Sequence, residues 1–200
     1  MKPTVPGDNT HAPELISEHG KGQVQVHLTK PVPPIHHQGP AHPVAQKTTP
    51  TVRERMAQLM DATVANEPNW HYHAIRPLSY PTLVQAEHGA VSADCSFGCS
   101  ILAKLAGAGD PLGQHFTGWG NSSSMFAHCQ RITRQDLQIG DFAVFGPGGD
   151  EHAVCIRKPG ADPVCWSHGQ EKGPMFVPLS AEKRAHPGAP VTFLRLPTTT

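Results

Sequence analysis

Apolar residues recur at helical spacing in two separate stretches of the chain. The first stretch covers residues 53–66, and its apolar positions are Met56, Leu59, Met60 and Val64. The second covers residues 94–106, and its apolar positions are Phe97, Ile101, Leu102 and Leu105. Positions three and four residues apart lie on one face of a helix. The pattern therefore predicts two helices, of which the first stops before Pro68 and the second before Gly107.

From residue 141 onward the pattern changes to short apolar runs separated by turn residues. Residues 141–145 and 152–157 flank a glycine-rich turn, which predicts a hairpin. Residues 164–167 and 191–196 predict two further strands. Helices first and a succession of antiparallel strands second indicate an α+β domain, in which the N-terminal helices pack on an antiparallel sheet.

The first fifty residues differ from the rest, because they hold nine prolines and six histidines. The segment 30–43 cannot form a helix, since proline removes amide donors and favours extended backbone. We expect residues 1–50 to form a disordered or linker-like arm and residues 51–200 to form the folded domain. A short strand at 23–28, loose metal binding by the histidines, and docking to a virion or host partner are further hypotheses for this arm, and a solvated tail is favoured over metal binding.

Composition and charge exclude several functions. The formal net charge is +0, so no basic surface for nucleic acid is indicated. No stretch approaches the roughly 18 apolar residues of a membrane span, so no membrane insertion is expected. The first thirty residues lack the apolar segment of a secretory signal. Five cysteines, an odd number, favour free thiols in a reducing compartment over a disulfide framework.

Cys95 stands at the start of the second predicted helix, directly after Asp94, which can cap that helix. The partial positive charge of a helix N-terminus stabilises a thiolate, the reactive form of cysteine. Backbone amides at the same terminus can form an oxyanion hole. A buried structural cysteine remains the alternative interpretation.

Two histidines follow at strand ends. His152 begins a predicted strand after the glycine-rich turn, and alternation puts Val154 and Ile156 on the same face. From a strand end, a histidine can reach across to a helix terminus and act as a base. His168 follows the next strand and can orient the ring of His152. With fourteen histidines in the chain, a surface position is the usual alternative for any one of them.

In order along the chain, four segments resemble the motifs of NlpC-type cysteine peptidases over residues 53–180. The run Ala93-Asp-Cys-Ser96 resembles the Asp-Cys-Ser nucleophile motif, and residues 137–145 are similar to the Leu-x-Pro-Gly-Asp-Leu-Val-Phe strand. The run His152-Ala-Val-Cys-Ile156 resembles the His-Val-Gly-Ile-Tyr strand, whose histidine is the base. Residues 167–174 are similar to a variant found in bacteriophage lysins and virion-borne peptidases. Tyr72 resembles the tyrosine that lies before the nucleophile.

This resemblance implies a papain-like α+β domain that cuts a peptide bond in the stem or cross-link of bacterial peptidoglycan without a cofactor. It assigns Cys95 as nucleophile, His152 as base and His168 as the orienting residue, with Tyr72 near the oxyanion. It also implies a phage-encoded endolysin or virion-associated lysin, found in the host cytoplasm before lysis or in the virion. An amidase or acyltransferase on the same scaffold, and a structural virion or wall-binding protein with an inactive peptidase domain, remain alternatives.

A zinc site is a further alternative, because His152, Cys155, Cys165 and His168 have the spacing of structural zinc ligands. Strand alternation argues against it, since His152 and Cys155 are expected on opposite faces. We therefore expect no metal, and interpret both cysteines as small apolar residues of paired strands.

The loop at residues 117–125 is rich in glycine and serine and is expected at the cleft. Trp119 is a candidate to cover the substrate and Asn121 to hydrogen-bond it. An ordinary surface loop with Trp119 packed against the core is an equal alternative.

Overall fold

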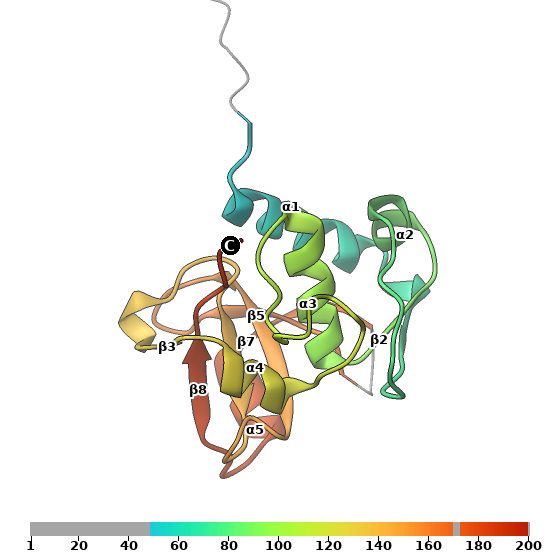
Figure 1. Ribbon diagram of the computed structural model, residues 1–200. Helices are drawn as coiled ribbons and strands as arrows, with labels where there is room; N and C mark the ends of the chain where they lie inside the picture. Colours follow the sequence, from blue (N-terminus) through green and yellow to red (C-terminus); the bar gives the residue numbers. More distant parts are fainter. Residues whose placement is uncertain (1–48, 170–172, 200) are drawn as a thin grey trace, which may run out of the picture. The chain divides into compact units, whose positions relative to one another are not determined.

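The computed structural model describes residues 49–169 and 173–199 (Figure 1). The predicted arm, with its possible strand at residues 23–28, lies outside the described residues, apart from residues 49 and 50. The division into an arm and a domain therefore stays a prediction.

Both predicted helices are present. Helix α1 covers Val52–Ala65 and begins with a capping box, in which the Thr51 hydroxyl accepts from the Glu54 amide at 3.2 Å and the Glu54 carboxylate accepts from the Thr51 amide at 2.7 Å. The short 3₁₀ helix η1 at Glu67–Asn69 follows it. Helix α3 covers Cys95–Ala106 and ends at Gly107, whose φ of 77° is the left-handed conformation typical of glycine after a helix.

The predicted strands join one antiparallel sheet of six strands, in the order β3-β8-β4-β5-β6-β7. The bounds are Arg131–Ile132 for β3, Phe142–Phe145 for β4, His152–Lys158 for β5, Val164–Ser167 for β6, Met175–Pro178 for β7 and Val191–Leu194 for β8. The predicted hairpin is the pair β4–β5, in which Phe145 lies opposite His152.

Several short elements complete the domain. Strands β1 (Trp70–Tyr72) and β2 (Val91–Ala93) pair in parallel, and helix α2 (Leu83–His88) lies between them in the chain. Helix α4 (Ser122–His128) occupies the end of the segment expected to be a loop. The 3₁₀ helix η2 (Arg134–Asp136) precedes β4, and helix α5 (Leu179–Ala185) joins β7 to the segment that leads into β8.

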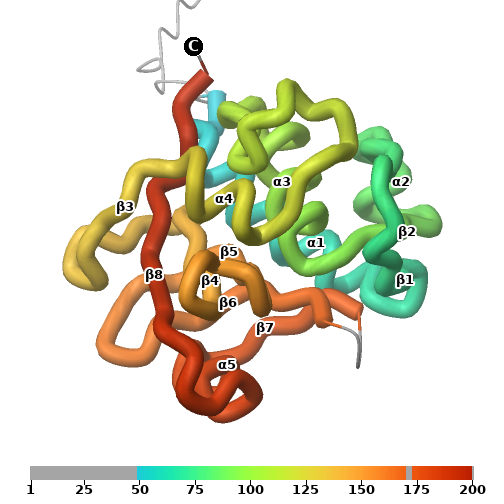
Figure 2. Tube along the Cα trace, turned by 60° about the horizontal axis from the view of Figure 1, so that its bottom comes forward, coloured from blue at the N-terminus to red at the C-terminus, as the bar shows by residue number. Residues whose placement is uncertain are grey.

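Both faces of the sheet are covered, and the two faces have separate cores. Figure 2 shows α3 and α5 on opposite sides of the central strands. The α3 face carries Phe142, Val144, Ala153, Cys155 and Trp166, which pack in one cluster with residues of α1 and α3. The α5 face carries Ala143, Phe145, Val154, Ile156 and Cys165, which cluster with Leu179. The α+β prediction, with helices packed on an antiparallel sheet, is confirmed.

Asp141, directly before β4, bonds to residues of α1 and to residues that follow β8. Its side chain is fully buried and forms ion pairs with Arg53 at 3.1 Å and Arg195 at 2.8 Å. Its carboxylate also accepts from the amides of Gln138 and Leu196, at 2.9 and 3.0 Å. A buried carboxylate needs this number of donors to offset its lost hydration. The Gly-Asp part of the motif at 137–145 therefore has a structural role.

None of the helices in the described part of the chain is long and apolar enough to cross a membrane.

Candidate functional site

Cys95 is the first residue of α3, beside a nearly buried charged network. Asp94 caps the helix by accepting from the Phe97 amide at 2.8 Å. The same carboxylate accepts from the Arg76 guanidinium at 2.7 and 2.6 Å and from the Ser96 hydroxyl at 2.9 Å. The network fixes the start of α3 and places one negative and one positive group beside the thiol.

The Cys95 side chain is only 8% exposed, and its environment favours the neutral thiol. Burial raises the pKa of Cys95 to about 11, and the Asp94 carboxylate acts in the same direction. Hydrogen bonding to the backbone at Ala153 and Ser96, and the charge of Arg76, lower the pKa but do not offset these effects. The resting protein therefore holds a protonated thiol at neutral pH, and its use as a nucleophile requires a base.

His168 lies on the same side of the sheet as Cys95. Its Nε2 is 3.0 Å from the carbonyl oxygen of Ala93, two residues before Cys95. A carbonyl only accepts, so Nε2 carries the proton, and the neutral ring has its basic lone pair on Nδ1. The ring is fully buried and lies edge-on to Trp70, with ring centres 5.6 Å apart.

Close packing of β6 on α3 determines this position. A Cβ added at Gly98 would lie 2.6 Å from the Trp166 ring, so only glycine lets the indole approach the helix so closely. The indole Nε1 donates to the Thr63 hydroxyl at 2.9 Å, which links β6 to α1 as well. His168 lies two residues beyond Trp166, and its contact with Ala93 places it near the start of α3.

Tyr72 joins the same group of residues. It lies opposite Ala93 in the parallel pair β1–β2, and its ring centre is 6.0 Å from that of His168. The structure thus gathers three sequence-predicted residues, Tyr72, Cys95 and His168, around Ala93.

His152 is not part of this group. It lies directly opposite Phe145, and the two rings are 6.0 Å apart on the α5 face of the sheet. Cys95 packs on the other face, in the cluster that contains Ala153. The contacts of the His152 ring thus lie on the α5 face, because successive residues of a strand point to opposite faces, and its role as the base for Cys95 stays a prediction.

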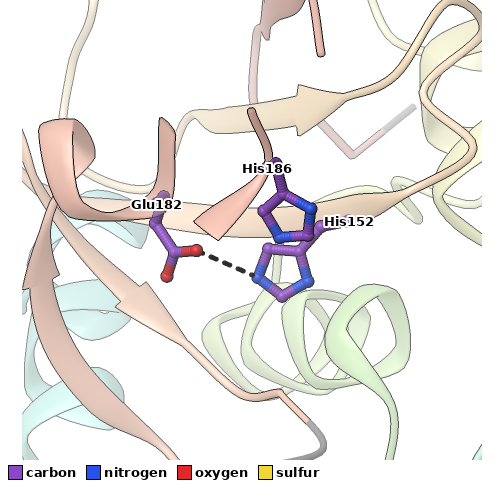
Figure 3. Close-up of side chains that lie close together, drawn as sticks. All are labelled: His152, Glu182 and His186. Carbon is purple, nitrogen blue, oxygen red and sulfur yellow. Dashed lines mark ion pairs between the residues drawn. The ribbon is translucent and has the colours of Figure 1, made fainter. Parts of the chain in front are cut away.

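His152 instead belongs to a second polar cluster, drawn in Figure 3. Its Nε2 is 3.6 Å from a carboxylate oxygen of Glu182 and 3.1 Å from the Ser167 hydroxyl. Its ring stacks on that of His186, with centres 4.9 Å apart and an interplanar angle of 16°. Burial, followed by the nearby His186, lowers the pKa of His152 to about 4, so this ring is neutral at pH 7.

Glu182 and His186 were missed by the sequence analysis. They stand four residues apart on and just after α5, a spacing that puts both on one face of a helical segment. That spacing was the available signal, but α5 has only seven residues and was not anticipated.

The zinc ligand set considered from the sequence is not assembled. Cys155 lies in the α3-side cluster, whereas Cys165 lies in the α5-side cluster. As expected, His152 and Cys155 point to opposite faces, and both cysteines are fully buried among paired strands. All five cysteines are free thiols.

The loop residues have different surroundings. Trp119 is 53% exposed, so it is not packed into the core as one alternative supposed. Its neighbour Gly118 accepts from the Leu78 amide at 3.1 Å, which ties the loop to the segment that carries Arg76. A groove of about 410 Å³ runs along that segment, lined in part by Leu78 and Ser92. Asn121 caps α4 by accepting from the Ser124 amide at 3.1 Å, which gives it a structural role. Substrate contact by either residue stays a prediction.

No protein-family model matches the chain, and no curated protein does. Among solved structures, the chain is similar to the P60 domain of an antigen from M. avium subspecies paratuberculosis, with a TM-score of 0.41 and 17% identity over 72% of this chain and 93% of that one. It is also similar to RipD from Mycobacterium tuberculosis, a non-catalytic NlpC/p60 domain protein with a peptidoglycan-binding function, with a TM-score of 0.41 and 17% identity over 70% of this chain and 96% of that one.

A third similar structure is the peptidoglycan hydrolase RipB from Mycobacterium tuberculosis, with a TM-score of 0.41 and 15% identity over 72% of this chain and 65% of that one. Of these similar structures, one is described as a peptidoglycan hydrolase and another as a non-catalytic NlpC/p60 domain protein.

Proposed function

We propose that this chain is a cysteine-dependent peptidoglycan hydrolase that cuts a peptide bond of the stem or cross-link. One observation carries the proposal: Cys95, at the capped start of α3, and His168, bonded to Ala93 at 3.0 Å, share one face of the sheet. The resemblance of four sequence segments to NlpC-type peptidases supplies the substrate class. His168 replaces His152 as the base in this proposal.

In this mechanism, Nδ1 of His168 takes the thiol proton as the Cys95 sulfur attacks the carbonyl carbon of the substrate. A C–S bond forms, the C–N bond breaks, and the imidazolium returns the proton to the leaving amine. Water then attacks the thioester and restores the thiol. Because burial raises the pKa of Cys95 to about 11, the thiol is protonated before the attack and needs His168 to remove its proton.

The developing oxyanion needs donors that are fixed before the reaction. Backbone amides at the start of α3 supply them, and the Tyr72 hydroxyl is a second candidate, because its strand pairs with the one that leads into Cys95. The ion pair of Arg76 with Asp94, at 2.6 Å, keeps the first turn of α3 in place.

The phage assignment is part of the proposal and rests on the sequence of residues 167–174. The structure describes residues 167–169 and 173–174 of this run. A lysin of this kind acts from the host cytoplasm at lysis or from a virion at entry. An amidase or acyltransferase would use the same residues, and the identity of the product distinguishes these reactions.

A wall-binding protein without activity is the second candidate. The buried, protonated state of Cys95 favours it, because a thiol that is 8% exposed with a pKa of about 11 is poorly prepared for attack. The two candidates differ in one measurable property, the release of new termini from peptidoglycan.

The experiment is muropeptide mass spectrometry after digestion of purified sacculi by the full chain. We expect new stem-peptide termini from the wild type, none from Cys95→Ala, and a loss of roughly 10²–10⁴-fold in rate for His168→Gln, the usual contribution of a general acid–base. Cys99→Ala, one turn further along α3, and His152→Gln, on the other face, serve as matched controls that keep activity. Equal activity of wild type and Cys95→Ala contradicts the mechanism, and sacculus binding without any release supports the wall-binding candidate.

A further inference from the structure

The cluster on the α5 face has the composition and spacing of a metal site. One ligand atom each from His152, Glu182 and His186 can be chosen so that all three lie within 4.8 Å of one another. The first two side chains are buried and the third is half-buried. Zinc binds imidazole and carboxylate at about 2.0–2.2 Å in a tetrahedral arrangement, so two ligand atoms of one ion are roughly 3.3–3.6 Å apart.

One of the three spacings already matches this value. Nε2 of His152 and the Glu182 oxygen are 3.6 Å apart, which one ion can bridge without movement. The remaining contraction, of about 1 Å for a tetrahedral ion, falls to His186, which follows α5 and is the most exposed of the three. Its ring must also turn out of the stack on His152 so that a nitrogen faces the ion. Figure 3 shows the Glu182 carboxylate directed toward His152 and the His186 ring stacked on the His152 ring.

Neighbouring groups are placed to orient the ligands. The Glu151 carboxylate is 3.5 Å from Nδ1 of His186, so it can hold the proton on that nitrogen and leave Nε2 for an ion. The Ser167 hydroxyl lies 3.1 Å from Nε2 of His152, and an ion would take its place as the partner of that nitrogen. Carboxylate–histidine pairs of this kind usually accompany metal-binding histidines.

Space for a further ligand lies beside the cluster. A cavity of about 150 Å³ is lined by Ser167 and Glu182 together with apolar residues of β7 and α5. It can hold water or a small ligand in a fourth coordination position, which three protein ligands leave open.

We propose that His152, Glu182 and His186 bind a divalent transition-metal ion, with zinc as the best fit. Two imidazoles and one carboxylate select such an ion over magnesium or calcium, which prefer oxygen ligands. The ion would clamp the segment after α5 to the start of β5. The site uses neither Cys95 nor His168, the two residues of the proposed hydrolytic mechanism, and it lies on the opposite face of the sheet.

The test is zinc binding by the full chain, freed of metal with a chelator and then titrated with Zn²⁺. Thermal unfolding and Co²⁺ absorption are recorded at each step. We expect Zn²⁺ to raise the melting temperature of the wild type, because an ion that binds only the folded state stabilises it. Six histidines in the first fifty residues add background binding, which is common to all variants.

Two variants remove a ligand, one removes an orienting group, and one is a control. Glu182→Gln and His186→Gln are expected to abolish the zinc-dependent shift and the tetrahedral Co²⁺ spectrum. Glu151→Gln is expected to weaken zinc binding by about 10–100-fold, the usual effect of losing an orienting partner. His88→Gln, at a side chain that is 77% exposed, is expected to match the wild type.

The proposal is overturned if the wild type shows no zinc-dependent shift, or if Glu182→Gln and His186→Gln bind zinc as tightly as His88→Gln. Should Glu182→Gln fail to fold, His186→Gln decides alone, since its side chain is 24% exposed and its loss is tolerated more easily. Peptidoglycan release plays no part in the readout, so failure of this proposal and failure of the proposed hydrolase are separable.

Discussion

Two substitutions beside Cys95 should change its reactivity in opposite directions. Asp94→Asn removes a negative charge that raises the pKa of Cys95, and asparagine caps a helix about as well as aspartate. Arg76→Gln removes the positive charge that lowers this pKa and leaves the Asp94 carboxylate without its ion pair. The first variant should therefore favour the thiolate, and the second should disfavour it.

The magnitude follows from the pKa. Burial and Asp94 raise the pKa of Cys95 from 9.0 to about 11, so the thiolate fraction near neutral pH is lower by about 100-fold, ten for each pKa unit. A charge within a few ångströms shifts a pKa by roughly 1–3 units. We expect Asp94→Asn to increase the alkylation rate at Cys95 by about tenfold, and Arg76→Gln to decrease it by a smaller factor, because the Arg76 charge has the weaker effect on this pKa.

The assay is iodoacetamide labelling followed by peptide-resolved mass spectrometry. Cys129 is an internal control, because it is 7% exposed and its pKa is raised to about 12 by burial and by Asp110, not by the network at α3. Global opening exposes both thiols alike, so the ratio of the two labelling rates reports the local change alone.

A slower rate for Asp94→Asn, or a faster rate for Arg76→Gln, relative to Cys129 would refute this electrostatic account of Cys95. Unchanged ratios in both variants would refute it too, because the network would then have no influence on the thiol.

Two further predictions concern stability. Asp141→Ala should lower the free energy of unfolding in urea by about 3–5 kcal/mol, because two arginines lose a buried partner. Its control is Asp61→Ala, at an exposed pair with Arg157, which should lower the same free energy by less than about 1 kcal/mol. Similar losses in the two variants would contradict the structural importance of the buried Asp141 carboxylate. Gly98→Ala should lower the unfolding free energy by about 1–2 kcal/mol, since overpacking against Trp166 outweighs the gain in helix propensity. Gly148→Ala, with nothing within 4 Å, is its control, and equal melting temperatures would refute the close contact.

Sequence pattern predicted the elements whose signals are local. The start of α3 at Cys95 followed from the capping residue Asp94 and the apolar face behind it, and the bounds of β6 followed from a short apolar run between turns. Helix α5 and strands β1 and β2 were not predicted. They have seven, three and three residues, which are too few to show a helical or strand periodicity of apolar positions.

The face of His152 could not be predicted. Alternation correctly grouped it with Val154 and Ile156, but the first five residues of β5 are all buried. A strand covered on both sides shows no polar–apolar alternation, so the sequence does not reveal which face meets the helix with the nucleophile. That choice is made by long-range packing, here by Ala153 and Trp166 against α3. His168 shares the face of Trp166, and its Nε2 contacts the carbonyl of Ala93, two residues before Cys95.

The position of β8 affects how the chain can be synthesised and shortened. This last strand inserts between β3 and β4, with Leu194 opposite both Arg131 and Phe142. Residues 191–194 must therefore leave the ribosome before the sheet can close, and β3 has no partner in the sheet until then. The Leu196 amide, bonded to Asp141 at 3.0 Å, fixes the residues that follow the strand. A chain cut after residue 190 would lose a central strand, and we expect it to collect in an aggregation-prone, partly folded state.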